Sequence, residues 1–315
     1  MTEISPPRIA VLIPCYNEET AIAKTVSDFR QALPQAVVYV YDNNSKDSTI
    51  ERARQAGAVV RSELRQGKGN VVRRMFADIE ADIYVLVDGD DTYDASAAPA
   101  LVSTLVKEGY DIVSGKRAHT ADAAYRRGHV LGNRLLTGLT AIMFRVKLAD
   151  MLTGYRIMSR RFVKSFPFTA EGFAIETELT VHAVRLMVPM LEVETRYKER
   201  PVGSVSKLNT YRDGFRILNT IAYLVREERP LIFFSVIFAF LVAFSLYVGV
   251  PVFLEYLDTG LVPRLPTAVL AMGLMLLAFL SLMSGLILDT VTRGRWEQKR
   301  MTYLSMSGPQ DLRLP

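Results

Sequence analysis

The sequence of 315 residues predicts an α/β fold with a mainly parallel sheet, followed by two membrane-spanning helices. Short apolar runs at residues 9–13, 37–41 and 58–61 alternate with helical patterns, an order typical of parallel sheets. Polar residues follow these runs, at the strand ends where such sheets bind ligands. Two later runs, residues 231–254 and 267–288, carry no charge and are each long enough to cross a bilayer.

A fourth apolar strand, residues 84–87, is followed by several carboxylates, Asp88, Asp90, Asp91 and Asp94. Carboxylates gathered at the end of a buried strand repel one another unless a cation lies between them, and oxygen ligands of this kind suit Mg²⁺ or Mn²⁺. The alternative is a polar turn without a metal, because Asp and Gly are common turn residues. On these residues alone, both interpretations stay open.

Lysine 68 stands between two glycines at the predicted start of a helix. The spacing does not match a P-loop, so we expect a loop in which the glycines allow close backbone approach and Lys68 faces an anion. A plain flexible loop is the alternative. Further along, Glu176 and Glu178 fall in the first turn of a helix predicted at residues 177–187, where acids suit the helix dipole without any catalytic role. A functional role for either stays open.

The middle of the chain is rich in cations. After a predicted helix at residues 95–108 and a strand at 111–114 come Arg117, Arg126 and Arg127, and later Arg200 and Lys207 flank a flexible stretch. These side chains suit phosphate groups, and a solvated basic loop is the alternative. Amphipathic helices are predicted at residues 130–146 and 208–225, where each can lie on a membrane surface or pack on the protein core.

Cations flank the two long apolar runs on their outer sides, at Arg226 and Arg229 and again at Arg293 and Arg295, whereas the connecting loop has Arg264 alone. By the positive-inside rule both termini face the cytoplasm. We therefore expect a catalytic domain at residues 1–207, a juxtamembrane helix at 208–230, a transmembrane hairpin at 231–288 and a cytoplasmic tail at 289–315. The net charge of +5 suits an anionic substrate or lipid surface.

Six ordered stretches, residues 14–18, 42–49, 67–69, 88–90, 153–156 and 203–207, together resemble the motifs of the family 2 glycosyltransferases. More narrowly, the chain is similar to the polyprenyl-phosphate glycosyltransferases, a group that includes dolichol-phosphate mannosyltransferase and its bacterial glucosyl relatives. The resemblance implies a GT-A fold and a metal, Mg²⁺ or Mn²⁺, on Asp88 and Asp90. It implies a nucleotide-sugar donor and a polyprenyl-phosphate acceptor.

The resemblance also implies roles for individual residues. It places phosphate-holding cations at Arg117, Arg126 or Arg127, Arg200 and Lys207. It implies that the nucleoside pocket is lined by Pro14, Tyr16, Glu18 and Asp42, with Lys68 close to it. The remaining candidates for substrate binding are Asn44, Asp91, Arg126, Arg127, Glu176, Glu178 and Ser206. Two departures, Asn43 after Asp42 and Thr92 past the acid pair, favour a UDP-sugar over GDP-mannose.

The predicted reaction is transfer of one sugar, from a donor such as UDP-glucose or UDP-GlcNAc, to undecaprenyl or dolichyl phosphate at the cytoplasmic leaflet. A GDP-mannose-dependent mannosyltransferase is the alternative within the group. From another class, a non-catalytic membrane scaffold that binds a nucleotide or lipid stays open. We expect no nucleic-acid partner, and a homo-oligomer also stays open. A processive polysaccharide synthase is less compatible, because it needs more spans to form a channel.

Overall fold

The computed structural model describes residues 6–118, 138, 150–167, 175–198, 223, 225–312 and 314. The chain divides into two compact units, one made of Met1–Gly214 with Gln298–Pro315 and the other of Phe215–Glu297. The amphipathic helices predicted at residues 130–146 and 208–225 lie almost wholly outside the described residues.

The first unit is built on a seven-stranded sheet in the order β3-β2-β1-β4-β6-β5-β7. Neighbouring strands pair in parallel, except that β6 is antiparallel to both β4 and β5. The predicted α/β fold with a mainly parallel sheet is therefore confirmed. The strands are β1 (Ile9–Cys15), β2 (Val37–Asp42), β3 (Val59–Ser62), β4 (Ile83–Leu86), β5 (Ile112–Ala118), β6 (Arg156–Ser159) and β7 (Met190–Arg196).

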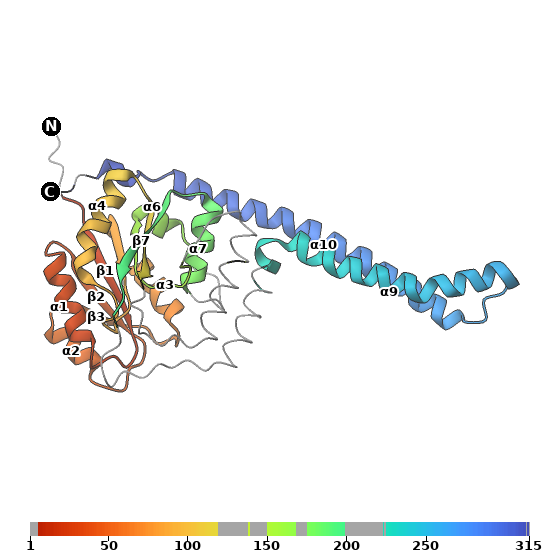
Figure 1. Ribbon diagram of the computed structural model, residues 1–315, viewed down its shortest axis with the longest axis horizontal. Helices are drawn as coiled ribbons and strands as arrows, with labels where there is room; N and C mark the ends of the chain where they lie inside the picture. The colour runs from red at the N-terminus through yellow and green to blue at the C-terminus, as the bar shows by residue number, and fades with distance from the viewer. Residues whose placement is uncertain are drawn as a thin grey trace. The chain divides into compact units, whose positions relative to one another are not determined.

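Helices cover both faces of this sheet, with α1 and α4 on one side of the strands and α3 and α7 on the other (Figure 1). Every residue of β1 and of β4 is buried, as expected for strands covered on both faces. In α1, Ile22, Val26 and Phe29 form the buried face at helical spacing. The helices are α1 (Ile22–Ala32), α2 (Thr49–Gln55), α3 (Lys68–Asp78), α4 (Ala98–Glu108), α6 (Arg160–Ser165) and α7 (Ile175–Leu186).

The helix predicted at residues 95–108 and the strand predicted at 111–114 differ in detail from the observed elements. The helix predicted at residues 95–108 begins as a 3₁₀ turn, η1 (Ala95–Ala97), and becomes α4 only at Ala98, where Pro99 stands in the first turn. Asp94 caps this start, since its carboxylate accepts a hydrogen bond from the Ser96 amide at 3.0 Å. The strand predicted at residues 111–114 runs on to Ala118 because it pairs with β7 along its whole length, so Arg117 lies on a strand.

Residues 298–315, the larger part of the tail predicted at 289–315, belong to the first unit. Helix α10 (Leu265–Leu304) continues past residue 288, and the short turn η2 (Pro309–Asp311) follows it. The Tyr303 hydroxyl donates to the Asp111 carboxylate at 2.6 Å, and Leu312 and Leu314 pack against the core of the unit. These contacts join segments 192 residues apart, so no local pattern could predict them.

Asp111 is completely buried at the start of β5 and is satisfied by three side chains. Arg161 donates from Nε and Nη2 at 2.6 and 2.7 Å, Ser159 from its hydroxyl at 2.6 Å, and Tyr303 completes the set. The Arg161 guanidinium also lies over the Tyr303 ring, 4.6 Å from its centroid. Burial and the Asp111 charge raise the pKa of Tyr303, so its hydroxyl stays a donor.

The second unit contains α9 (Pro230–Thr259) and most of α10, and both helices are candidate membrane spans. Only 6% of the apolar window of α9 and 17% of that of α10 is buried, whereas a core helix of a soluble protein would be mostly buried. Ser245 donates to the Ala271 carbonyl at 2.7 Å, and Ser281 to the Phe234 carbonyl at 3.2 Å. Serine hydrogen bonds of this kind are typical of helix pairs in membranes.

Candidate active site

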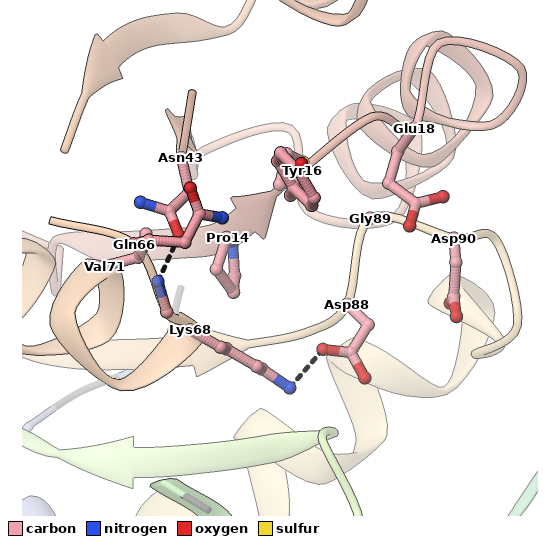
Figure 2. Close-up of a pocket in the computed structure, with 12 residues that line it drawn as sticks. Pro14, Tyr16, Glu18, Asn43, Gln66, Lys68, Val71, Asp88, Gly89 and Asp90 are labelled. Carbon is pink, nitrogen blue, oxygen red and sulfur yellow. Dashed lines mark hydrogen bonds and ion pairs between the residues drawn. The ribbon is translucent and has the colours of Figure 1, made fainter. Parts of the chain in front are cut away.

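The carboxyl ends of three neighbouring strands bring the sequence motifs together. Strand β1 lies between β2 and β4, with Cys15 beside Asp42 in one pair and Leu12 beside Leu86 in the other. The loops after these strands therefore share one edge of the sheet, where ligands of such folds bind. A pocket of about 330 Å³ opens at this edge (Figure 2). It is lined by Pro14, Cys15, Tyr16, Glu18, Asn43, Gln66, Gly67, Lys68, Val71, Asp88, Gly89 and Asp90.

Half of this lining consists of residues that the sequence analysis named: Pro14, Tyr16, Glu18, Lys68, Asp88 and Asp90. Four others lie within the motifs of the sequence analysis but were not assigned to the site, although each stands next to an assigned residue: Cys15, Asn43, Gly67 and Gly89. Gln66 and Val71 carry no such signal, because the loop before α3 and the first turns of that helix bring them to the pocket.

The acid pair follows β4, and its two carboxylates have different surroundings. Asp90 is almost fully buried, and its Oδ1 accepts hydrogen bonds from the Thr92 hydroxyl at 2.6 Å and the Thr92 amide at 3.3 Å. Asp88 is more open, with 31% of its side chain exposed. Behind Asp88 lies Gly154, where an added Cβ would stand 2.5 Å from the carboxylate. The observed position of the Asp88 carboxylate therefore requires a residue without a side chain at position 154.

Lys68, in the first turn of α3, forms ion pairs with two carboxylates. Its ammonium bonds to Asp88 Oδ1 and, at 2.5 Å, to Glu176 Oε1 (Figure 2 shows the contact with Asp88). Burial alone would lower the pKa of Lys68, but the charges of Asp88 and Glu176 together raise it well above its ordinary value. Lys68 is thus a charged cation fixed at the metal-binding pair that the sequence predicts.

The two glutamates at the start of α7 differ in their partners. Glu178 accepts from Arg73 Nη2 at 2.9 and 3.0 Å, and both of these side chains are nearly buried. Glu176 instead joins the cluster of Lys68 and Asp88. Sequence analysis could not separate the two, because their partners depend on how α7 packs against α3.

The loop at residues 63–67, one wall of the pocket, is held by two asparagines. Asn43 donates from Nδ2 to the carbonyls of Glu63 and Arg65, both at 2.8 Å, and accepts from the Gly67 amide at 2.6 Å. Asn44 was predicted to bind substrate, but its amide donates to the Leu64 carbonyl at 2.9 Å and to Gln66 Oε1. Both side chains thus shape the loop.

Asp42, at the end of β2, is 2% exposed and has an unsatisfied acceptor. Its Oδ2 accepts from the Ser45 amide at 3.0 Å, while its Oδ1 has no hydrogen-bond partner among the described residues. Leaving a buried acceptor unsatisfied costs about 1–3 kcal/mol. Asp42 itself does not line the pocket, although its chain neighbour Asn43 does.

Comparison with known proteins identifies the family. The sequence profile described as Glycosyl transferase family 2 matches residues 10–166. Glycosyltransferase AglJ of Haloferax volcanii is 36% identical over 233 residues, which are 73% of this chain and 76% of the relative. The chain belongs to glycosyl transferase family 2. A dolichyl-phosphate hexose transferase of the same organism is 29% identical to this glycosyltransferase over 229 residues, 73% of this chain and 99% of the relative.

Solved structures share the fold of this glycosyltransferase. Glucosyl-3-phosphoglycerate synthase from Mycobacterium tuberculosis, crystallised with Mn²⁺, UDP-glucose and phosphoglyceric acid, matches with a TM-score of 0.55 and 24% identity. The match covers 70% of this chain and 79% of that one. At this identity the likeness concerns the fold, and it confirms the GT-A-like architecture that the resemblance implied.

Several residues predicted for the glycosyltransferase site do not line this pocket or are not described. Asp91 pairs with Lys24 at 3.2 Å and lies 3.8 Å from Lys198. Arg117 forms a bidentate ion pair with Asp150, at 2.7 and 2.8 Å, which holds the pKa of that carboxyl below its usual value although burial would raise it. The following predicted residues lie outside the described ranges: Arg126, Arg127, Arg200, Ser206 and Lys207.

The acid pair fits a hard divalent metal only as part of a ligand set. Among the described residues, no group of three or more His, Cys, Asp and Glu side chains is arranged to hold a metal ion. Asp88 and Asp90 supply oxygen ligands, and Mg²⁺ commonly completes such a set with water and substrate phosphates. The Lys68 ammonium on Asp88 shows that this carboxylate already attracts a cation. The residues present therefore fit Mg²⁺ or Mn²⁺ bound together with a diphosphate.

Proposed function

We propose that this glycosyltransferase moves one sugar from a nucleotide-diphosphate sugar to a polyprenyl phosphate at the cytoplasmic leaflet, with a UDP-sugar as the preferred donor. The observation that carries the proposal is the pocket where Asp88, Asp90 and Lys68 meet, in a chain that also has two candidate membrane spans. A hydrophilic acceptor would not explain the apolar surface of these helices, which expose Phe240 by 70% and Tyr247 by 78%.

The relatives support a lipid-linked acceptor. A transferase named for dolichyl phosphate aligns over 99% of its own length with this chain. The cations at Arg226, Arg229, Arg293 and Arg295 flank the two candidate spans on their outer sides, which favours the cytoplasmic leaflet. The polyprenyl group would lie in the bilayer, and its phosphate would lie at the surface.

On the donor side, Asp88 and Asp90 would hold the metal, which when bound supplies Lewis-acid stabilisation of the departing nucleotide diphosphate. Asp42 offers its unsatisfied carboxylate oxygen to an N–H group of the base. The loop fixed by Asn43 encloses the nucleotide, and Lys68 adds positive charge beside the diphosphate. These residues bind and orient the donor.

The acceptor needs orientation more than activation. A phosphate monoester with a second pKa of about 6 is mostly dianionic at neutral pH, so it attacks with little help from a general base. Glu176 already pairs with Lys68, which is consistent with a site that needs no glutamate base. The predicted phosphate-holding cations Arg117, Arg126, Arg127, Arg200 and Lys207 stay a prediction.

The test is transfer of radiolabelled sugar into organic-extractable lipid. Membranes containing the full chain are supplied with polyprenyl phosphate, Mg²⁺ or Mn²⁺, and UDP-glucose, UDP-GlcNAc or GDP-mannose in turn. We expect label in lipid from a UDP-sugar. Label from GDP-mannose alone would mean that GDP-mannose, and not a UDP-sugar, is the donor. Nucleotide binding without any lipid product would favour a non-catalytic scaffold.

A matched pair of carboxylate variants tests the site in the same assay. Asp90→Asn should lower the transfer rate by about 100-fold or more, since metal stabilisation of the leaving group is worth several kcal/mol and 1.4 kcal/mol is tenfold. Asp28→Asn removes a partly exposed carboxylate that pairs with Lys24, and it should leave the rate within about twofold. Equal rates for Asp90→Asn and wild type would remove the acid pair from the mechanism.

A further inference from the structure

Lys68 lies between two carboxylates, one of which belongs to the proposed metal pair. Its ammonium contacts Asp88, the more exposed carboxylate of the proposed metal pair, and also Glu176 from α7. Figure 2 shows the Lys68 side chain extending along the pocket to Asp88. A lysine in this place occupies Oδ1, one of the two carboxylate oxygens that Asp88 offers to a metal.

The charges of this cluster explain why the lysine stays there. Asp88 and Glu176 carry two negative charges, and Lys68 supplies one positive charge between them. Without the lysine, the carboxylates of Asp88 and Glu176 would face each other with no cation between them, and Asp90 lines the same pocket as Asp88. Lys68 therefore stabilises the site before any substrate binds.

A divalent ion and an ammonium cannot both stay on the same carboxylate oxygen, because like charges at such distances repel strongly. Glu176 offers Lys68 a second anchor, 13% exposed and 2.5 Å away, that is not part of the acid pair. The lysine stem is flexible and carries three donors, so the ammonium can move while it keeps one carboxylate partner.

We propose that Lys68 is an exchangeable cation: it neutralises Asp88 in the empty site, yields this carboxylate to the divalent metal, and then pairs with the donor diphosphate while Glu176 retains it. The proposal rests on the proposed function, which supplies the metal and the diphosphate. Its consequence is coupling. Metal alone must displace Lys68, whereas metal with a nucleotide gives the lysine a new anionic partner, so each ligand strengthens binding of the other.

The test measures Mn²⁺ binding to the purified full chain by electron paramagnetic resonance, with and without UDP. Lys68→Met should bind Mn²⁺ alone about tenfold more tightly than wild type, because nothing then competes for Asp88. UDP should strengthen Mn²⁺ binding about tenfold or more in wild type and less than about threefold in Lys68→Met. Lys107→Met, an exposed lysine in the last turn of α4, should behave as wild type in both respects.

The ratio between the two Mn²⁺ affinities separates exchange from simple charge. If Lys68 only repelled the metal and attracted the nucleotide in place, Lys68→Met would change each affinity but leave the UDP effect on Mn²⁺ binding as large as in wild type. That result would overturn the exchange. Glu176→Gln provides a second variant: Lys68 then has Asp88 as its remaining carboxylate, so Mn²⁺ alone should bind several-fold more weakly. Unchanged or tighter binding would contradict the anchor role of Glu176.

Failure of the proposed function gives a different result. If neither wild type nor Lys68→Met binds Mn²⁺, with or without UDP, the metal-dependent donor site is wrong and the exchange falls with it. If both proteins bind Mn²⁺ and UDP with the same coupling, the donor site stands and the exchange alone is wrong. Lys68→Arg retains a cation and should keep most of the coupling, which provides a check that loss in Lys68→Met is not a folding defect.

Discussion

Gly154 is the residue on which the position of Asp88 depends. An added Cβ would come within 2.5 Å of the Asp88 carboxylate, and the Gly154 amide donates to the Tyr93 hydroxyl at 2.8 Å, so the backbone cannot easily withdraw. Gly154→Ala should therefore displace Asp88 and lower sugar transfer by about tenfold or more, since misplaced catalytic groups commonly cost that much. The assay is label in extractable lipid, with Mn²⁺ affinity measured in parallel.

A glycine with open surroundings provides the control. Gly294 in α10 has nothing within 4 Å of an added Cβ, so Gly294→Ala should leave transfer unchanged and favour the helix by up to about 1 kcal/mol. A Gly154→Ala protein with wild-type transfer and wild-type Mn²⁺ affinity would show that Asp88 tolerates the displacement.

For single residues, the sequence predicted that the acids after the buried strand lie close together, but it did not predict the contacts that each acid makes. Asp88 and Asp90 follow a buried strand, and that position brought them to the pocket. Asp94, the last of the four acids, instead caps the start of the next helix. The contacts of Asn43 and Asp150 could not be predicted, because their partners, loop carbonyls for Asn43 and Arg117 for Asp150, come from other parts of the chain.

At the scale of one element, α7 contains a buried histidine that should make the protein sensitive to acid. His182 is 1% exposed, lies between the rings of Phe162 and Phe166, and has Ser165 Oγ 3.1 Å from its Nε2. Burial, with a smaller contribution from the charge of Lys299, lowers the pKa of His182 to about 3. The histidine is therefore neutral in the folded protein at physiological pH.

The sign of the pH effect follows from this shift. Below a pH of about 6.5 the unfolded chain binds a proton at His182 that the folded chain refuses until about pH 3, so stability falls as the pH is lowered through this window. The slope contributed is about 1.4 kcal/mol per pH unit. Thermal unfolding in detergent between pH 7 and 5 should show a shallower dependence for His182→Gln than for wild type. If the unfolding temperatures of the two proteins changed equally with pH, His182 would not be the source of the effect.

The sequence pattern predicted α7 within two residues at its start but gave no sign of this burial. The partners of His182 come from α6 and from Phe166 just after it, which belong to a different stretch of the chain. The spacing of apolar residues predicts helices and strands. It does not predict which of them pack together, so the contacts of His182 could not be foreseen.

At the scale of the whole molecule, the C-terminal segment is held in the first unit by a buried polar cluster. Tyr303→Phe removes one hydrogen bond from the buried Asp111 carboxylate, and bonds to charged groups are worth about 1.5–3 kcal/mol. We expect a loss of stability of that size, measured by denaturant unfolding of the full chain in detergent. Tyr247→Phe, at a side chain that is 78% exposed, should change stability by no more than about 0.5 kcal/mol. Equal effects of the two substitutions would mean that the cluster contributes little.

The order of these segments along the chain has a consequence for biosynthesis. The first unit takes residues from both sides of the two candidate spans, so Asp111 is synthesised long before Tyr303. A ribosome that has made the acid pair and the whole sheet must still make both apolar helices before η2 and Leu312 can join the core. The first unit is therefore completed only in chains that have already produced both candidate spans.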